Sequence, residues 1–279
     1  LVNIEILVDE EPIFDLKIAM KQNSLVMPKM LLKKGDALKK INNSEYVIED
    51  EITIGGQDHF YLEGQISLVI PDEDNKFTVW SSTQHPTEVQ HCVANVLGIS
   101  QAKVTSKVRR LGGGFGGKES QASIIASITA LCSWYFGKPA KLRLTRHDDM
   151  LATGKRHDFL SLYKVGFNSN GRIQGLEVNL LSRAGNVADL SGPVMTRAMT
   201  HIDNCYSLKN VTINGYCCKT NTVSNTAFRG FGGPQGIITI ETIIDSIARK
   251  LTRPIEEIRN INLYSKNNGL KTPYGQIVN

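Results

Sequence analysis

The chain has 279 residues, 41% of them hydrophobic and 21% charged, with a formal net charge of +5. This apolar fraction is sufficient for a buried core, and so balanced a charge argues against a disordered chain. Polar residues interrupt every long apolar run before the roughly 20 residues that a membrane helix needs, and aromatic and basic residues are not interleaved, so neither a membrane nor a nucleic acid is an expected partner.

The first part of the chain is predicted to be a small α/β or β-rich unit. Alternating polarity predicts strands in three segments, residues 41–48, 51–54 and 66–70. Pro71 and the acidic turn at residues 72–75 then interrupt the pattern. We therefore place a domain boundary at this turn.

The second part alternates strands and helices, which indicates a mixed α/β fold. Strands are predicted at residues 77–80, 103–111, 141–145, 159–167, 172–182, 211–213 and 217–218, with a hairpin turn at 168–171. Helices are predicted at residues 86–97, 119–136 and 235–251. Gly98 and Gly137 are expected to end the first two helices.

Two glycine-rich loops share the tetrapeptide Gly-Phe-Gly-Gly, at residues 114–117 and 230–233, and a helix is predicted after each. Glycine lets the backbone approach a ligand closely, and a helix N-terminus attracts anions. A P-loop at residues 112–118 is excluded because Glu119 stands where a Ser or Thr would hold Mg²⁺. A dinucleotide site is disfavoured because residues 120–147 contain no acid. A tight turn without a ligand remains the alternative.

Four motifs occur in a consistent order, at residues 55–63 (GGQDHFYLE), 82–84 (STQ), 112–119 (GGGFGGKE) and 225–236 (NTAFRGFGGPQG). Together they resemble the molybdenum-binding subunit of the xanthine dehydrogenase and aldehyde oxidase family, over nearly the whole chain. The resemblance implies an α+β fold. Residues 1–72 would form the C-terminal part of an α/β hammerhead-like domain, and residues 73–279 the first molybdopterin-binding domain.

The resemblance also implies a cofactor, a molybdenum ion held by a pterin dithiolene and carrying a sulfido ligand, with no protein side chain on the metal. Gln84 would face the oxo ligand of the molybdenum. The backbone N–H groups of Phe115 and Arg229 would approach its coordination sphere, and Gly114 and Gly116 would lie near the pterin. Iron–sulfur clusters of the 2Fe-2S type and FAD would belong to other domains or to a partner subunit.

The same resemblance points to a purine substrate. Glu119 would hydrogen-bond the purine, Arg197 would hold its carbonyl oxygen and stabilise negative charge in the transition state, and Phe231 would pack against the ring. The implied reaction is hydroxylation of xanthine or hypoxanthine with water as the oxygen source. The glutamate that acts as general base in this family has no counterpart here, so the isolated chain is expected to be inactive. Taken alone, without the resemblance, the two residues favour simpler roles, Glu119 as a carboxylate at a helix N-terminus and Arg197 as a surface ion-pair residue.

Two alternative functions remain, an aldehyde oxidase-type hydroxylase with another substrate and a non-catalytic scaffold that packs against partner subunits. The five cysteines are odd in number and include no C-x-x-C motif, so ligation of zinc or an iron–sulfur cluster by this chain is not expected. A reducing, cytoplasmic compartment fits this cysteine content best. The six histidines lack metal spacing and are expected to be structural or surface residues. The chain starts at Leu1 and not at Met, and we expect a piece of a longer protein whose remainder is a partner.

Overall fold

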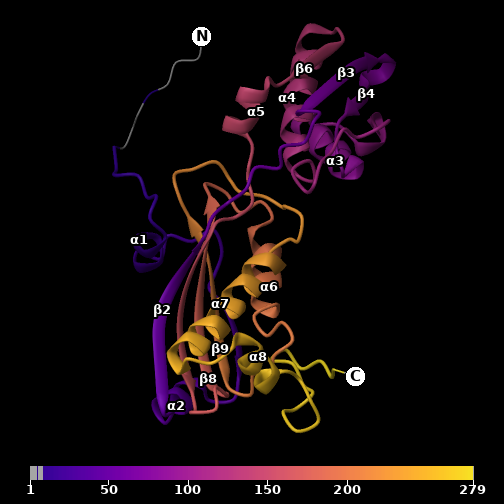
Figure 1. The fold of residues 1–279 in the computed structure, drawn as a ribbon. Helices are drawn as coiled ribbons and strands as arrows, with labels where there is room; N and C mark the ends of the chain where they lie inside the picture. The colour runs from indigo at the N-terminus through magenta and orange to yellow at the C-terminus, as the bar shows by residue number, and fades with distance from the viewer. Residues whose placement is uncertain (1–4, 6–8, 279) are drawn as a thin grey trace.

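A computed structural model describes residue 5 and residues 9–278. It contains two sheets with helices packed on them, and the chain passes from the large sheet to the small one and back (Figure 1). The strand order is β1-β9-β8-β7-β2 in the large sheet and β5-β4-β3-β6 in the small sheet. The predicted mixed α/β fold is confirmed.

The large sheet forms the main core. Its strands are β1 (Met30–Lys34), β2 (Tyr46–Ile54), β7 (Phe159–Phe167), β8 (Ile173–Gly185) and β9 (Val211–Lys219), antiparallel except for the parallel pair β8 and β9. One face is covered by α6 (Ser191–Thr200), α7 (Gly233–Leu251) and α8 (Ile255–Asn262) (Figure 1). The opposite face contacts α1 (Leu16–Lys21) and α2 (Ala37–Asn42).

The small sheet and its helices are called here the small lobe, residues 66–152. Its strands are β3 (Ile66–Asp72), β4 (Lys76–Ser81), β5 (Val104–Lys107) and β6 (Ala140–Arg143). Its helices are α3 (Pro86–Leu97), α4 (Gln121–Phe136) and α5 (Arg146–Ala152), with short 3-10 helices at Glu73–Asn75 and Gln101–Lys103. Buried Val69, Val79, Val93 and Ala126 join the sheet to α3 and α4 in a second core. Among the residues described, no helix is both long and apolar enough to cross a membrane.

Several predicted element boundaries are confirmed, and others are wrong. Helix α3 covers the predicted residues 86–97, and both Gly98 and Gly137 have the left-handed conformation of a helix end. The strand predicted at 103–111 is shorter, since β5 ends at Lys107. The strand predicted from residue 41 is wrong at its start, because α2 continues to Asn42 and β2 begins at Tyr46.

The predicted domain boundary at residue 72 does not coincide with a boundary between sheets. Strands β1 and β2, which precede it, pair with β9 and β7 of the large sheet, whereas β3 pairs within the small sheet. The described residues before this boundary therefore contribute to both cores. The division into a hammerhead-like domain and a molybdopterin-binding domain stays a prediction.

Candidate functional site

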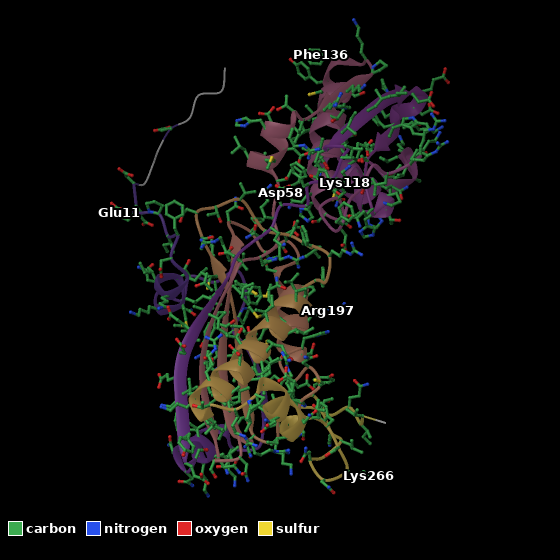
Figure 2. The ribbon with its side chains drawn as sticks, viewed as in Figure 1. Glu11, Asp58, Lys118, Phe136, Arg197 and Lys266 are labelled. Atoms are coloured by element: carbon green, nitrogen blue, oxygen red, sulfur yellow. The ribbon has the colours of Figure 1, made fainter. Side chains whose placement is uncertain are left out.

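The two glycine loops meet at the junction between the sheets. Loop 1 (residues 112–119) leads toward α4 and loop 2 (residues 225–236) leads into α7. The N–H of Arg229 donates to the Phe115 carbonyl at 2.9 Å. Figure 2 shows Lys118 of loop 1 in the small lobe near this junction, with Arg197 on α6 beside the large sheet. The two loops therefore form one continuous surface.

The repeated tetrapeptide forms the same turn twice. The N–H of Gly117 donates to the Gly114 carbonyl at 2.8 Å, and that of Gly233 to the Gly230 carbonyl at 2.9 Å. The central pairs have positive φ, 53° and 99° in loop 1 and 51° and 96° in loop 2. Positive φ at both central positions is typical of a type I′ turn and is strained for phenylalanine. No strand leads directly into either turn, since β5 and β9 end well before them.

Gln84 is fixed against loop 1. Its side-chain oxygen accepts the N–H of Gly116 at 2.8 Å, and its own N–H donates to the Lys118 carbonyl at 2.8 Å. A backbone N–H can only donate, so the amide oxygen must face the loop and Nε2 must point elsewhere. In the described part of the chain, neither Nε2 of Gln84 nor the N–H of Phe115 has a hydrogen-bond acceptor. Two unused donors therefore lie at the same turn.

The glycines of these loops are required by contacts within the protein. A Cβ on Gly114 would lie 2.5 Å from the Gln84 side-chain oxygen, and one on Gly116 would lie 2.6 Å from the Ala227 carbonyl oxygen. Any larger residue would separate loop 1 from Gln84 or from loop 2. The close approach that the glycines allow is thus between parts of this chain.

Lys118 gives an independent reason to exclude a P-loop. The side chain is fully buried, and Nζ donates to the Glu63 carbonyl at 2.6 Å, to Ser82 Oγ at 2.7 Å and to Glu63 Oε2 at 3.3 Å. An ammonium group has three hydrogens, and all are used. It has none left to bind a phosphate.

Arg197 and Phe231 line the same open hollow of about 710 Å³, bordered by α6 and loop 2. Arg197 is exposed, and no carboxylate of the described residues lies within ion-pair distance of it. Helix α6 packs directly on loop 2, because a Cβ on Gly232 would lie 2.1 Å from the Val194 carbonyl oxygen. Glu119 is half-buried and does not line this hollow.

The structure does not support the predicted role of the Arg229 backbone. Its N–H is directed at the Phe115 carbonyl, so this donor connects the two loops and is not available to a ligand. The Phe115 side chain is 47% exposed at the loop surface.

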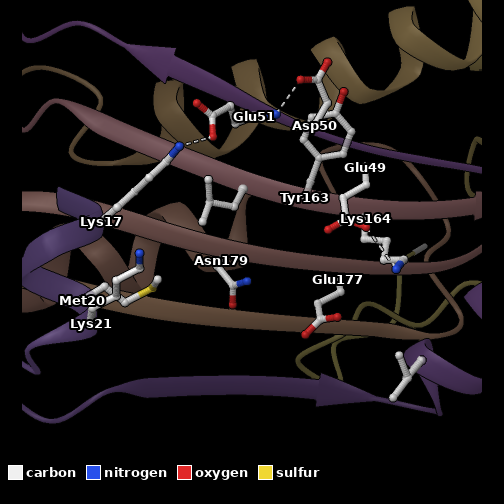
Figure 3. A pocket seen from close by; sticks show the side chains of 12 residues that line it. Lys17, Met20, Lys21, Glu49, Asp50, Glu51, Tyr163, Lys164, Glu177 and Asn179 are labelled. Atoms are coloured by element: carbon white, nitrogen blue, oxygen red, sulfur yellow. Dashed lines mark hydrogen bonds and ion pairs between the residues drawn. The ribbon is translucent and has the colours of Figure 1, made fainter. Parts of the chain in front are cut away.

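Another hollow, of about 740 Å³, lies elsewhere, on the large-sheet face near α1 (Figure 3). Its charged residues are partly paired, with Lys17 2.6 Å from Glu51 and Lys164 3.1 Å from Glu49. Exposed ion pairs of this kind are common on solvated surfaces and contribute little energy. This hollow has no contact with either glycine loop.

Sequence reasoning missed two residues at the junction, His59 and Arg156. His59 was predicted to be a structural or surface residue, and it is buried with its Nε2 2.7 Å from the Ala227 carbonyl oxygen of loop 2. Arg156 donates to the Arg229 carbonyl at 2.9 Å. The motif at residues 55–63 was the available signal for His59, whereas no sequence pattern marked Arg156.

His157 predicts a pH dependence of stability. The side chain is buried, with Nε2 2.8 Å from Ser191 Oγ, and burial lowers its pKa to about 4 from the usual 6.5. Below pH 6.5 the unfolded chain gains a proton that the folded chain does not, so acid favours unfolding. We expect this group to lower the free energy of unfolding by about 2 kcal/mol between pH 7 and pH 5. Urea titrations of the wild type and His157→Gln at both pH values measure it; equal losses would contradict the prediction.

No three His, Cys, Asp or Glu side chains among residues 5 and 9–278 are grouped to hold a metal ion.

Comparison with known proteins gives the family. The model of the molybdopterin cofactor-binding domain matches residues 20–263. A xanthine dehydrogenase/oxidase of Gallus gallus is 46% identical over 255 residues, which are 91% of this chain and 19% of the relative. The chain thus spans about a fifth of this relative's length.

Other relatives differ in the substrate that their names give. A nicotinate hydroxylase of Emericella nidulans is 42% identical over 241 residues, covering 86% of this chain and 18% of the relative. The solved aldehyde oxidoreductase of Desulfovibrio gigas has a TM-score of 0.81 and 24% identity, over 90% of this chain and 27% of that one. This last likeness shows the fold alone. With its family model matched over most of its length, the chain belongs to the molybdopterin cofactor-binding domain family.

Proposed function

We propose that the chain is part of a molybdenum hydroxylase that oxidises xanthine or hypoxanthine at a purine carbon, with water as the oxygen source. One observation carries this proposal. An unpaired arginine and a phenylalanine, Arg197 and Phe231, share one hollow beside loop 2, and loop 2 in turn contacts the turn with unused donors at Gln84 and Phe115. The arrangement offers a cation and a ring on the substrate side and hydrogen-bond donors on the cofactor side.

The residues present fit a molybdenum–pterin group that is bound through hydrogen bonds. When bound, this group supplies the redox chemistry and delivers the oxygen atom of water to the substrate. Gln84 Nε2 and the N–H of Phe115 would donate to its oxo ligand, a strong acceptor. The turn at Gly114 and Gly116 holds both donors in place without rearrangement, which favours tight binding.

Three residues of this chain would contact the purine substrate. The Arg197 guanidinium would bind a purine carbonyl oxygen and stabilise the negative charge that develops there. Phe231 would pack on the heterocycle. Glu119 would accept or donate a hydrogen bond at another edge of the ring, which requires it to face the ligand although it lies outside the hollow described here. A glutamate elsewhere in the full-length protein would serve as general base.

The remaining parts of the enzyme lie outside this chain. The proposal includes the rest of the molybdenum subunit, 2Fe-2S clusters and FAD on other domains or a partner subunit, and an inactive isolated chain. A cytoplasmic location belongs to the proposal as well, supported by five cysteines that form no disulfide.

An aldehyde oxidase-type enzyme with another substrate is the second candidate. It is favoured by the relative named as a nicotinate hydroxylase, whose 42% identity is close to the 46% of the xanthine dehydrogenase/oxidase. Overall sequence identity therefore does not decide the substrate. The residues that line the hollow with Arg197 and Phe231 must decide it.

Elemental analysis and isotope labelling of the full-length protein test the proposed function. We expect one molybdenum and one pterin per chain, and ¹⁸O from labelled water in the hydroxylated purine. A protein without molybdenum would support the scaffold alternative. A molybdenum protein that oxidises nicotinate or aldehydes but no purine would support the second candidate.

A further inference from the structure

The ring of Phe228 in loop 2 contacts two buried side chains that come from outside both loops. The His59 ring lies with its centroid 4.7 Å from that of Phe228, and the Arg156 guanidinium carbon lies 3.9 Å from the Phe228 centroid. His59 and Arg156 are only 7% and 8% exposed. Phe228 is half-buried, and a ring in contact with both a buried imidazole and a buried guanidinium has restricted freedom to move.

The same two side chains hold the backbone of loop 2. The Ala227 carbonyl can only accept, so His59 Nε2 carries the hydrogen and donates to it at 2.7 Å. Arg156 Nη2 donates to the Arg229 carbonyl at 2.9 Å. Between them, the Phe228 carbonyl accepts the N–H of Phe231 at 2.7 Å. Three consecutive carbonyl groups are thus fixed, immediately before the strained turn at Phe231.

Each of the two side chains is itself anchored elsewhere. Arg156 Nε donates to the Gln57 side-chain oxygen at 2.7 Å, and the Arg156 N–H donates to the Gln57 carbonyl at 3.0 Å. His59 packs against loop 1, since a Cβ on Gly117 would lie 2.6 Å from its ring. The segment from Gln57 to His59 therefore connects loop 1 to loop 2, and this gives the motif at residues 55–63 a physical role.

Arg156 has a chemistry that no other residue type reproduces. It stacks on a ring while two of its nitrogens donate in fixed directions, which suits a planar guanidinium and not a lysine ammonium. Its remaining nitrogen, Nη1, is buried with no acceptor among the residues described, and no carboxylate of that part of the chain pairs with it. An unpaired buried charge is costly, so the fixed directions of its contacts, and not its charge, distinguish Arg156 at this site.

We propose that His59 and Arg156 are positioning residues that clamp residues 227–229 and so set where Phe231 and the turn of loop 1 stand. The inference rests on the proposed function, in which these two turns face the substrate and the molybdenum group. It assigns neither side chain to the chemistry itself. A displacement of about 1 Å at such a site costs up to roughly 100-fold in rate.

The test uses the full-length enzyme and four variants. His59→Phe keeps a ring against Phe228 but removes the donor, whereas His59→Gln restores a donor at a similar distance. Arg156→Lys keeps the charge but removes the planar fork. Arg172→Lys is the matched control, since this half-buried arginine donates to the Ile261 carbonyl near α8, away from both loops.

Three readouts are compared, kcat and KM for the purine, the molybdenum(V) electron paramagnetic resonance signal of the reduced enzyme, and molybdenum content. We expect His59→Phe and Arg156→Lys to lower kcat/KM about 10- to 100-fold and to change the signal, with molybdenum content within twofold of the wild type. His59→Gln and the control should stay within about threefold of wild-type kcat/KM.

Either of two results would overturn the proposed clamp. In the first, His59→Phe and Arg156→Lys have the same kcat/KM and the same molybdenum(V) signal as the control. In the second, His59→Gln loses as much kcat/KM as His59→Phe. If His59→Phe does not accumulate as folded protein, Arg156→Lys against Arg172→Lys decides by the same readouts. An absent molybdenum signal in the wild type would overturn the proposed function, and this inference with it.

Discussion

Arg197→Met in the full-length enzyme is expected to lower kcat/KM for xanthine by about 100- to 1,000-fold. The Arg197 guanidinium is exposed in a hollow with Phe231 and without a carboxylate partner in the described structure, so its charge is available to an anionic transition state. Methionine keeps the length of the side chain and removes that charge. Steady-state kinetics of the wild type and the variant measure the effect.

Arg249→Met is the matched control. Arg249 is a highly exposed arginine on α7 that pairs with Asp245 at i,i+4, and such a pair contributes less than about 1 kcal/mol. It should leave kcat/KM unchanged. Glu119→Val provides a second, separate test of purine binding, since it removes the proposed hydrogen bond and should also lower purine turnover steeply. Unchanged purine turnover in both Arg197→Met and Glu119→Val would reject the assignment to a purine substrate.

Gly232→Ala is expected to destabilise the chain by about 4 kcal/mol, the largest effect of any single methyl group considered. Gly232 has a φ of +96°, and an added Cβ would lie 2.1 Å from the carbonyl oxygen of Val194 in α6. Backbone cannot move away as the end of a flexible side chain can. The substitution must therefore push α6 away from loop 2, and Arg197 moves with α6.

Gly98→Ala separates backbone strain from collision. Gly98 also has positive φ, +65°, but nothing lies within 4 Å of the added Cβ. It should cost only about 1 kcal/mol, the strain of a left-handed alanine. Urea unfolding of the wild type, Gly232→Ala and Gly98→Ala measures both losses in the free energy of unfolding. A Gly232→Ala chain no less stable than Gly98→Ala would show that α6 does not pack on loop 2 as described.

Local sequence signals predicted much of the fold because they act over short distances. Pro86 and Gly98 delimit α3, and Asn168 to Gly171 turn the β7–β8 hairpin, through backbone preferences that need no tertiary contact. Helix α2 escaped prediction because it has only six residues, stabilised by the Asp36 cap and by packing on the large sheet. The sequence did not predict that β1 and β2 belong to the large sheet, because their partner strands β9 and β7 lie far along the chain.

The site was predictable only in part. The motifs identified Gln84, Phe115 and Phe231, and the structure brings the loops that carry them into contact. Their residue types alone could not show that the Arg229 N–H is used by the Phe115 carbonyl, because that contact joins two loops across the junction of the sheets. Nor could they reveal Arg156, whose role depends on a ring in loop 2.

The position of the small lobe between β2 and β7 has a consequence for the order of folding. Tyr46 pairs with Phe167, and Met30 pairs with Gly215, so the large sheet cannot close until the whole small lobe has been synthesised. Within the small lobe, by contrast, β3 pairs with the next strand β4 and β4 pairs with the next strand β5, so that only β6 returns from far along the chain, and closing shorter loops costs less entropy. We expect the small lobe to fold first on the ribosome. Strands β1 and β2 remain unpaired until β9 and β7, their partners in the large sheet, have been synthesised.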